Sequence, residues 1–344
     1  MTSSIIGWDV GGANLKAAGI GDDPSPEPVV VERPFRLWRE PERLPVVLTE
    51  IAAGLGGASS RMAITMTAEL ADCFATRRDG VRSVIDAFRR AFPGVELAIY
   101  GTDGRFRSVP EALRVPLDVA AANWIATATL AARTFSDAIL IDVGSTTTDI
   151  IPIAGGRVAA TARTDAGRLV AGELVYTGAL RTPVCAVVRW VPLGDRLCRV
   201  AAEHFATAAD AYLWLGRIEE RDYTSETSDG RGRSRPEAGA RLARMVCADI
   251  ETLGEDEITA IAGQVARAQA RQIAGGIRQV RRRLGPSAPS TALVAGGGGF
   301  LARDAAEAAG LEVRELADLI GRAAARAAPA AAVAYLLAEG ADSG

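Results

Sequence analysis

The 344-residue sequence has few of the residue types that build metal sites, nucleic-acid surfaces or membrane spans. It contains one histidine, His204, and four cysteines with no Cys-x-x-Cys pair, so the usual spacing of a zinc site is missing. Aromatic residues make up 5%, and arginines are scattered along a chain of net charge -3, which argues against nucleic-acid binding. The Ala-rich end is interrupted by Arg322, Arg326 and Pro329, and the start has no signal-peptide pattern. We therefore expect a cytoplasmic protein with reduced thiols and without nucleic-acid or membrane partners.

Lysine is as scarce as histidine: the 39 Lys and Arg residues include one lysine, Lys16. A chain this rich in Ala, Gly and Arg would carry arginine wherever a cation is needed only for solubility. Lys16 therefore indicates a place that requires a compact ammonium group, although a chance survivor of codon bias would look the same. The motif around it favours the functional interpretation.

That motif occurs twice, at Ile6–Lys16 and at Leu140–Asp149. In each copy an apolar run ends in Asp-Val-Gly, small or hydroxylated residues follow, and a second apolar run begins. This pattern predicts a strand, a tight glycine turn and a second strand. Such a turn offers backbone N–H groups to an anion, and the aspartate before it can hold a divalent cation. We expect the two turns to face each other and to clamp a polyphosphate with its metal.

With 49% hydrophobic residues the chain can build two cores, which we place at residues 1–135 and 136–344. Each half opens with a β meander, followed by alternating helices and strands of an α/β fold. The predicted strands are Ile5–Asp9, Leu15–Ile20, Val29–Arg33, Met62–Met66, Leu97–Tyr100, Ala138–Val143, Ile150–Ile153, Val158–Thr164 and Ala292–Ala295. The predicted helices are Pro41–Leu55, Gly80–Phe92, Val119–Phe135, Leu197–Gly216, Pro236–Leu253, Asp256–Leu284, Leu301–Ala309 and Leu316–Glu339.

This organisation resembles the superfamily of actin, sugar kinases and Hsp70-type ATPases. The resemblance implies a duplicated ribonuclease-H-like fold whose two domains flank a cleft. Its two phosphate motifs would be the turns described above. The late tract Ala295–Phe300 takes the place of the glycines that line the nucleoside side of the cleft, here Gly296, Gly297 and Gly298.

Five phrases resemble one branch of this superfamily more closely. They are Gly7–Lys16, Thr65–Asp72, Ala122–Trp124, Asp142–Asp149 and Phe205–Asp210. They are similar to the methanofuran-type coenzyme synthases, hydantoinase/oxoprolinase-like proteins of methanogens and of methylotrophic bacteria with a tetrahydromethanopterin-linked one-carbon pathway. The resemblance implies a transferase that joins an aminomethylfuran-methyl diphosphate to the phenol of a tyramine or tyrosine unit, free or glutamylated. Diphosphate would leave, no ATP would be consumed, and in a bacterium the product would be methylofuran.

The residues of the turns suit this chemistry. A furfuryl carbon ionises readily because its ring oxygen delocalises the cation, so catalysis has mainly to stabilise the departing diphosphate. We expect Mg²⁺ on Asp9 and Asp142. We assign diphosphate binding to Lys16, to the amides of Gly11, Gly12, Gly144 and Ser145, and to the side chains of Asn14, Thr146 and Thr147.

The general base is left open among several carboxylates. One of the two aspartates, the less certain third acid Asp149, or Glu69 or Asp72 would take the phenolic proton. Glu69 and Asp72 are three residues apart, so on a helix they would share a face, although a solvated helix start would look the same.

Two further features have competing interpretations. The segment Tyr223–Pro236 is polar; its arginines Arg231, Arg233 and Arg235 would either clamp diphosphate as a lid or belong to a solvated loop. Asn123 lies in an apolar helix, where a role in the cleft competes with simple packing.

Other functions of the same fold remain open. The main alternative is an ATP-dependent small-molecule kinase or hydrolase. The second alternative is an ATP-gated binding module. Whether the protein uses ATP is therefore left open. A homodimer is the expected oligomer if the chain associates at all.

Overall fold

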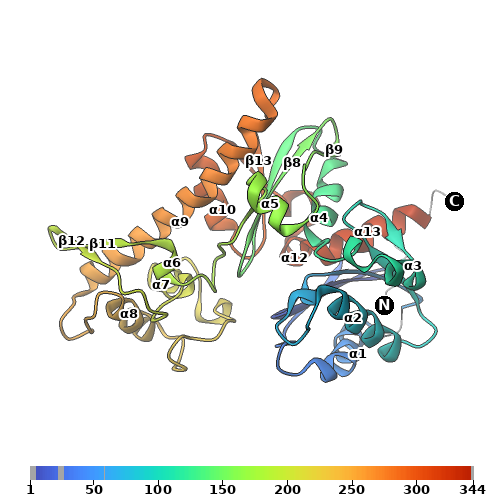
Figure 1. The fold of residues 1–344 in the computed structure, drawn as a ribbon, viewed down its shortest axis with the longest axis horizontal. Helices are drawn as coiled ribbons and strands as arrows, with labels where there is room; N and C mark the ends of the chain where they lie inside the picture. The colour runs from blue at the N-terminus through green and yellow to red at the C-terminus, as the bar shows by residue number, and fades with distance from the viewer. Residues whose placement is uncertain (1–4, 22–26, 58, 342–344) are drawn as a thin grey trace. The chain divides into compact units, whose positions relative to one another are not determined.

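The computed structural model describes residues 5–21, 27–57 and 59–341, and its elements group into two compact units (Figure 1). The first unit consists of Met1–Leu140, Ile151–Gly167 and Arg314–Gly344, and the second of Ile141–Ile150 and Arg168–Val313. Each unit thus combines several chain segments, whereas the sequence interpretation divides the chain once, after residue 135.

The first sheet has the strand order β3-β2-β1-β4-β5-β6. Its strands are β1 (Ile5–Val10), β2 (Asn14–Ile20), β3 (Val29–Pro34), β4 (Arg61–Met66), β5 (Glu96–Tyr100) and β6 (Phe106–Arg107). β2 runs antiparallel to β1, whereas β4 runs parallel to both β1 and β5. The carboxyl ends of β1, β4 and β5 therefore meet at one edge of the sheet.

Helices cover both faces of this sheet, which explains why β1 and β4 are almost continuously apolar. On one face Trp8 belongs to the core formed with α1 (Leu44–Gly54) and α2 (Arg77–Ala91). On the other face lies α13 (Ala328–Ala341), so close that a Cβ on Gly7 would be 2.0 Å from the carbonyl oxygen of Ala330 (Figure 1). A larger residue at position 7 would push α13 off the sheet.

Shorter helices complete the first unit. They are η1 (Pro41–Arg43), η2 (Ala68–Leu70), α3 (Val109–Arg114), η3 (Pro116–Asp118), α4 (Asn123–Ala132), α11 (Ala317–Ile320) and α12 (Arg322–Arg326). The helix predicted to begin at Val119 begins at Asn123, because Ala121 has a positive φ of 51°. The single helix predicted from Leu316 is three helices. Gly321, with φ of 83°, separates α11 from α12, and Ala327, with non-helical φ of -120° and ψ of 42°, separates α12 from α13.

The second sheet has the order β10-β8-β7-β13-β14, with β9 also paired to β8. Its strands are β7 (Ala138–Val143), β8 (Thr148–Ala154), β9 (Arg157–Val158), β10 (Leu174–Val175), β13 (Thr291–Ala295) and β14 (Glu312–Glu315). β8, β7, β13 and β14 thus take the places that β2, β1, β4 and β5 have in the first sheet. This repeated order confirms the predicted duplicated ribonuclease-H-like fold of the α/β class.

The helices of the second unit are α5 (Asp165–Ala171), which begins in the first unit, α9 (Glu255–Leu284), η5 (Gly285–Ser287) and α10 (Gly299–Ala308). α9 lies directly on the sheet: a Cβ on Gly276 would be 2.7 Å from Ile150 Cδ1 and 2.9 Å from Val175 Cγ2. The long helix therefore approaches the strands through a glycine.

An insertion between β10 and α9 forms its own hydrophobic core against the first half of α9 (Figure 1). Its elements are α6 (Val184–Val187), β11 (Trp190–Leu193), β12 (Arg196–Arg199), α7 (Ala208–Trp214), η4 (Glu220–Asp222) and α8 (Arg235–Arg244). The helix predicted over Leu197–Gly216 is wrong in its first half, where β12 and an irregular segment lie. α7 starts only at Ala208, where Asp210 accepts hydrogen bonds from Thr207 as a capping box.

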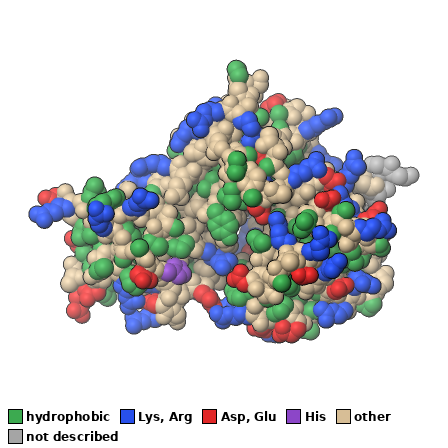
Figure 2. All heavy atoms as spheres, in the orientation of Figure 1, with side chains coloured by type: hydrophobic (Ala, Val, Ile, Leu, Met, Phe, Trp, Pro, Cys, Tyr) green, Lys and Arg blue, Asp and Glu red, His purple; other side chains and the backbone are tan. Residues whose placement is uncertain are grey.

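Basic and acidic side chains are interspersed over the face of the molecule shown in Figure 2, without a continuous basic stripe. Among the described residues, no helix is both long and apolar enough to cross a membrane.

Candidate active site

The two Asp-Val-Gly turns have the same backbone geometry. In the first, the N–H of Gly11 donates to the carbonyl oxygen of Asn14 at 3.0 Å; in the second, the N–H of Gly144 donates to that of Thr147 at 2.9 Å. These two amides close the turns, which favours other amides for diphosphate; their own role in binding it stays a prediction. The amides of Gly12 and Ser145 donate no hydrogen bond to any described residue.

Segments from elsewhere in each unit hold the turn carbonyls. In the first unit Leu37 donates to the carbonyl of Gly12 and Phe35 to that of Ala13, both at 3.0 Å. Because C=O and N–H of a trans peptide point in opposite directions, the amides of Ala13 and Asn14 point away from this support. No sequence pattern singles out the amide of Ala13.

The second turn is held in a similar way by residues 179–181. Their amides donate to the carbonyls of Gly144 at 2.9 Å and of Ser145 at 3.1 and 2.9 Å. The amides of Ser145 and Thr146 accordingly point the other way. Gly178 allows the approach, since a Cβ there would lie 2.5 Å from the backbone nitrogen of Thr146.

Below the first turn a polar row crosses the sheet. Asp9 is paired across β2 with Lys16 and across β4 with Thr65, and Lys16 is paired across β3 with Glu32. Directly paired residues share a face, so these four side chains lie side by side on the face that α13 covers. The hydroxyl of Thr65 is buried and has no hydrogen-bond partner among the described residues.

Lys16 is partly exposed, and its ammonium group already has contacts. Nζ donates to the carbonyl oxygen of Arg326 at the end of α12, at 3.0 Å, and lies 3.7 Å from the carboxylate of Glu32. An ammonium group at a helix C-terminus stabilises the carbonyls left open there. Lys16 thus has a structural role as well as its place beside Asp9.

Glu69 lies in the 3₁₀ helix that follows the end of β4. Thr67, between them, donates its N–H to the carbonyl of Val10 at 2.9 Å, which places this segment close to the first turn. Glu69 is buried, and its Oε1 accepts from Arg77 at 2.9 Å, while Oε2 has no partner among the described residues. Burial raises the pKa of Glu69, and Arg77 opposes this shift. Arg77 also lies 3.4 Å from Asp165.

Asp72 differs from Glu69 in both conformation and burial. Glu69 is in the 3₁₀ helix Ala68–Leu70, whereas Asp72 follows it and is exposed. The prediction that the two acids share a helix face is therefore wrong, because no helix continues through position 72.

The two remaining candidate carboxylates, those of Asp142 and Asp149, lie in the second unit. Asp142 on β7 is covered by Gly296, where a Cβ would be 2.3 Å from its Oδ1. Asp149 on β8 accepts from Arg168 at 2.6 Å, and Arg168 is 2% exposed. Asp149 thus neutralises a buried guanidinium, a role that its sequence position did not indicate.

The late glycine tract packs on the end of β7. Gly298 donates to the carbonyl of Val143 at 2.9 Å, and a Cβ on Gly298 would lie 2.4 Å from Val143 Cγ1. At Gly297, by contrast, a Cβ would meet nothing within 4 Å. Two of the glycines predicted to bind ligand are therefore required for packing beside Asp142, and a role in ligand binding stays a prediction.

A buried glutamine of α9 supports the second turn from behind. Gln269 Nε2 donates to Thr177 Oγ1 at 2.8 Å and to the carbonyl of Gly178 at 2.7 Å, and Oε1 accepts from Tyr212 at 2.8 Å. Gln269 is 0% exposed. It joins α7 to the segment that holds the turn carbonyls, and no local sequence pattern indicates it.

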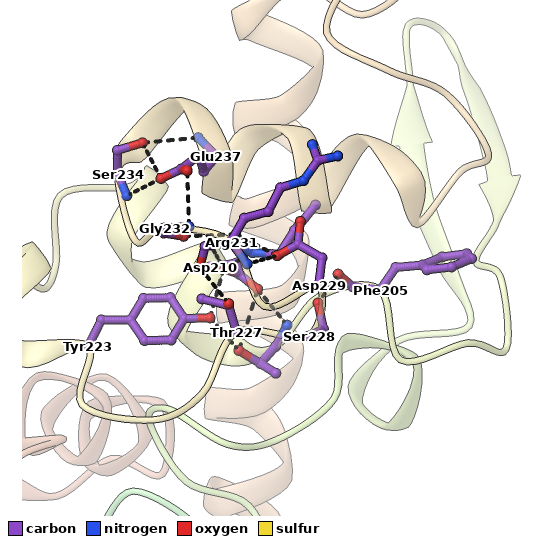
Figure 3. A network of polar contacts seen from close by, with 12 residues as sticks. Phe205, Asp210, Tyr223, Thr227, Ser228, Asp229, Arg231, Gly232, Ser234 and Glu237 are labelled. Atoms are coloured by element: carbon purple, nitrogen blue, oxygen red, sulfur yellow. Dashed lines mark hydrogen bonds and ion pairs between the residues drawn. The ribbon is translucent and has the colours of Figure 1, made fainter. Parts of the chain in front are cut away.

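α7 is in turn fixed by a second buried network (Figure 3). Asp210 accepts from the N–H of Thr207 at 2.8 Å, from Tyr223 at 2.9 Å and from Arg241 Nε at 2.8 Å. Burial raises the pKa of Asp210, against the effect of these donors. Arg241 also reaches Asp229 at 3.2 Å, which ties down the loop between Tyr223 and α8.

That loop is the one considered above as a lid. Thr227 Oγ1 donates to the carbonyl of Arg231 at 2.7 Å, and Gly232 donates to Glu237 at 3.0 Å (Figure 3). The guanidinium of Arg235 stacks 3.9 Å from the Trp214 ring centre and pairs with Glu255 at 3.2 Å. These contacts favour a loop fastened to the insertion over an arginine lid.

Within the described residues no group of three or more His, Cys, Asp or Glu side chains is placed to hold a metal. Asp9 and Asp142 each directly precede the Val-Gly of one turn. This donor set does not suit zinc, but it suits Mg²⁺, which commonly takes one or two carboxylates and completes its shell with phosphate oxygens and water.

Comparison with known proteins identifies the family. The model of the hydantoinase/oxoprolinase family matches residues 61–339. The chain belongs to this family. It is 38% identical over 267 residues to the Methanocaldococcus jannaschii protein named (4-{4-[2-(gamma-L-glutamylamino)ethyl]phenoxymethyl}furan-2-yl)methanamine synthase, covering 77% of this chain and 78% of that protein.

Two further proteins are similar to this chain, one in sequence and one in fold. A Methanococcus vannielii protein of the same name is 40% identical over 124 residues, covering 36% of this chain and 55% of the relative. The nucleotide-free structure of acetone carboxylase shares the fold, with a TM-score of 0.54 and 10% identity over 91% of this chain and 68% of that one. The hydantoinase/oxoprolinase family member described here is therefore an enzyme, related over 77% of its length to a named synthase.

Proposed function

We propose that this enzyme forms an aryl ether between a furan-methyl group and a phenol in methanofuran or methylofuran biosynthesis. The observation that supports this most is the 38% identity, over 77% of the chain, to a protein whose name describes such an ether. The electrophile is a furan-methyl diphosphate and the acceptor is the phenol of a tyramine or tyrosine unit, free or glutamylated. The phenol oxygen bonds to the methylene carbon, the carbon–oxygen bond to diphosphate breaks, and the phenolic proton goes to a base.

The groups proposed for the departing diphosphate are backbone amides and small polar side chains. From the first turn these are the amides of Gly12 and Ala13 and the ammonium of Lys16. From the second they are the amides of Ser145 and Thr146 and the hydroxyls of Ser145, Thr146 and Thr147. Preorganised donors of this kind stabilise developing negative charge without reorganising during the reaction.

A Mg²⁺ ion, when bound, would neutralise charge on the leaving diphosphate. Asp9 and Asp142 are the residues proposed to hold it, because each directly precedes a turn whose amides are suited to phosphate. Their carboxylates would orient the ion, while the turn amides bind the phosphate oxygens.

Glu69 is the carboxylate best suited to take the phenolic proton. Its Oε2 has no hydrogen-bond partner among the described residues, and burial raises the pKa of the carboxyl and so its basicity. Asp72 is exposed, and Asp149 is paired with a buried arginine. Arg77 would keep Glu69 ionised and oriented before the proton arrives.

The proposal is tested by incubating the purified enzyme and Mg²⁺ with the furan-methyl diphosphate and each acceptor, with and without ATP. Ether and diphosphate are followed by mass spectrometry. We expect Lys16→Ala and Asp142→Asn each to lower kcat/KM by about 10²- to 10³-fold. The matched control is Asp195→Asn, at a side chain 94% exposed in the β11–β12 hairpin, which should leave the rate unchanged. ATP consumed with no ether formed would instead support a kinase or hydrolase.

A further inference from the structure

The first unit contains a cavity of about 420 Å³. None of the residues proposed above to bind diphosphate or Mg²⁺, or to act as the base, lines this cavity. The cavity is formed by α4, by the loop after β5, and by the segment from β9 to position 163. This volume lies in the range of small-molecule sites. One of the phrases singled out in the sequence, Ala122–Trp124, contributes the indole of Trp124 to its wall.

The charges around the cavity do not balance. Arg133 is ion-paired with Glu339, and Asp103 makes two bonds of 2.9 Å to Arg107, which holds the pKa of Asp103 below its ordinary value. The two remaining guanidinium groups are those of Arg157 and Arg163. Neither makes an ion pair or a hydrogen bond to any described residue, and both residues are exposed. Two positive charges at the cavity are thus uncompensated within the described part of the chain.

The rest of the wall combines the polar side chains of Thr102 and Thr129 with a group of apolar ones. Beside the indole of Trp124 it includes Ile125, Val158, Ala160 and Ala162. Arginine forks match carboxylate and phosphate oxygens, whereas an aromatic and aliphatic wall favours a flat apolar body. A ligand that satisfies both would be an anion joined to a ring or to a short apolar chain.

We propose that this cavity is a second binding site, for a small organic anion with an apolar body, in which Arg157 and Arg163 bind the anionic group. The site does not depend on the proposed ether synthesis, because it shares no residue with either turn. The chemistry it recognises is that of an aryl or alkyl carboxylate or phosphate.

Titration calorimetry with phenylacetate tests this site, since phenylacetate has both the ring and the charge. Acetate and phenol provide each half alone, and each should bind at least about tenfold more weakly than phenylacetate. Arg157→Ala/Arg163→Ala should weaken phenylacetate binding at least about tenfold. Ala160→Phe, which keeps both charges but fills the cavity, should do the same.

The matched control is Arg78→Ala/Arg82→Ala, which removes two exposed arginines on α2 that do not line the cavity. This control changes net charge by the same amount and should leave phenylacetate binding unchanged, as should Lys16→Ala on β2. Equal losses in both double variants would reduce the effect to general electrostatics and overturn the proposal. Binding that survives in Ala160→Phe, or no binding to the unmodified enzyme, would also overturn it. Circular dichroism and thermal unfolding of each variant exclude misfolding as the cause.

Discussion

Replacing Gln269 by methionine tests whether the second turn is supported from behind by a buried amide. The substitution preserves volume but removes three hydrogen bonds, to Tyr212, Thr177 and Gly178. The Tyr212 hydroxyl is left with no partner, which costs about 1–3 kcal/mol. Thr177 and Gly178 keep their contacts to Thr182, so each loses less, about 0.5–1 kcal/mol. We expect a total destabilisation of about 2–5 kcal/mol.

The assay is urea denaturation combined with hydrogen exchange of the α7 and α9 amides, which reports on the second unit. Adding Tyr212→Phe to Gln269→Met removes the orphaned hydroxyl and should recover about 1–2 kcal/mol. The matched control is Gln279→Met on the same helix, whose amide donates to the carbonyl of Val170 at a more exposed place; we expect it to change stability by less than about 1 kcal/mol. A Gln269→Met effect as small as the control, or no recovery by Tyr212→Phe, would refute the reasoning.

Three further predictions concern other parts of the fold. Gly276→Ala should destabilise the folded protein, because its Cβ would lie 2.7 Å from a side-chain carbon of the sheet. Gly275→Ala on the same helix meets nothing within 4 Å and should stabilise the fold by about 0.5–1 kcal/mol. Thermal unfolding compares the two variants, and equal effects would contradict the prediction. Asp210→Asn should cost up to about 3–5 kcal/mol, because buried Arg241 loses the nearer of its two carboxylates and keeps only Asp229. Arg241→Met in the same chain should recover part of this loss in urea unfolding, and no recovery would mean that the pair is not coupled. Because burial raises the pKa of Glu69 above 4.5, the stability of the natural protein relative to Glu69→Gln should fall as pH rises through the folded-state pKa; a difference independent of pH would contradict the shift.

The features that sequence reasoning predicted correctly are those encoded locally. The Asp-Val-Gly phrases predict two strand–turn–strand units, and both form with the same closing hydrogen bond, from Gly11 and from Gly144. The same pattern could not show that these amides are occupied within the turn. That follows only from the hydrogen-bonded register of the following strand.

The features that were missed depend on partners far apart in the chain. Gln269 meets Thr177 across 92 positions, and Arg168 meets Asp149 across 19. The predicted shared face of Glu69 and Asp72 failed because a single 3₁₀ turn replaces a helix there. Helix periodicity in Ala-rich segments likewise could not reveal the interruption at Gly321.

The most direct test of the ether synthesis uses an acceptor whose phenol oxygen is labelled with ¹⁸O, together with the furan-methyl diphosphate, Mg²⁺ and no nucleotide. We predict that the label is retained in the ether, that released diphosphate is unlabelled, and that added ATP is not consumed. Label found on a phosphorylated phenol, or product formed only when ATP is consumed, would contradict it.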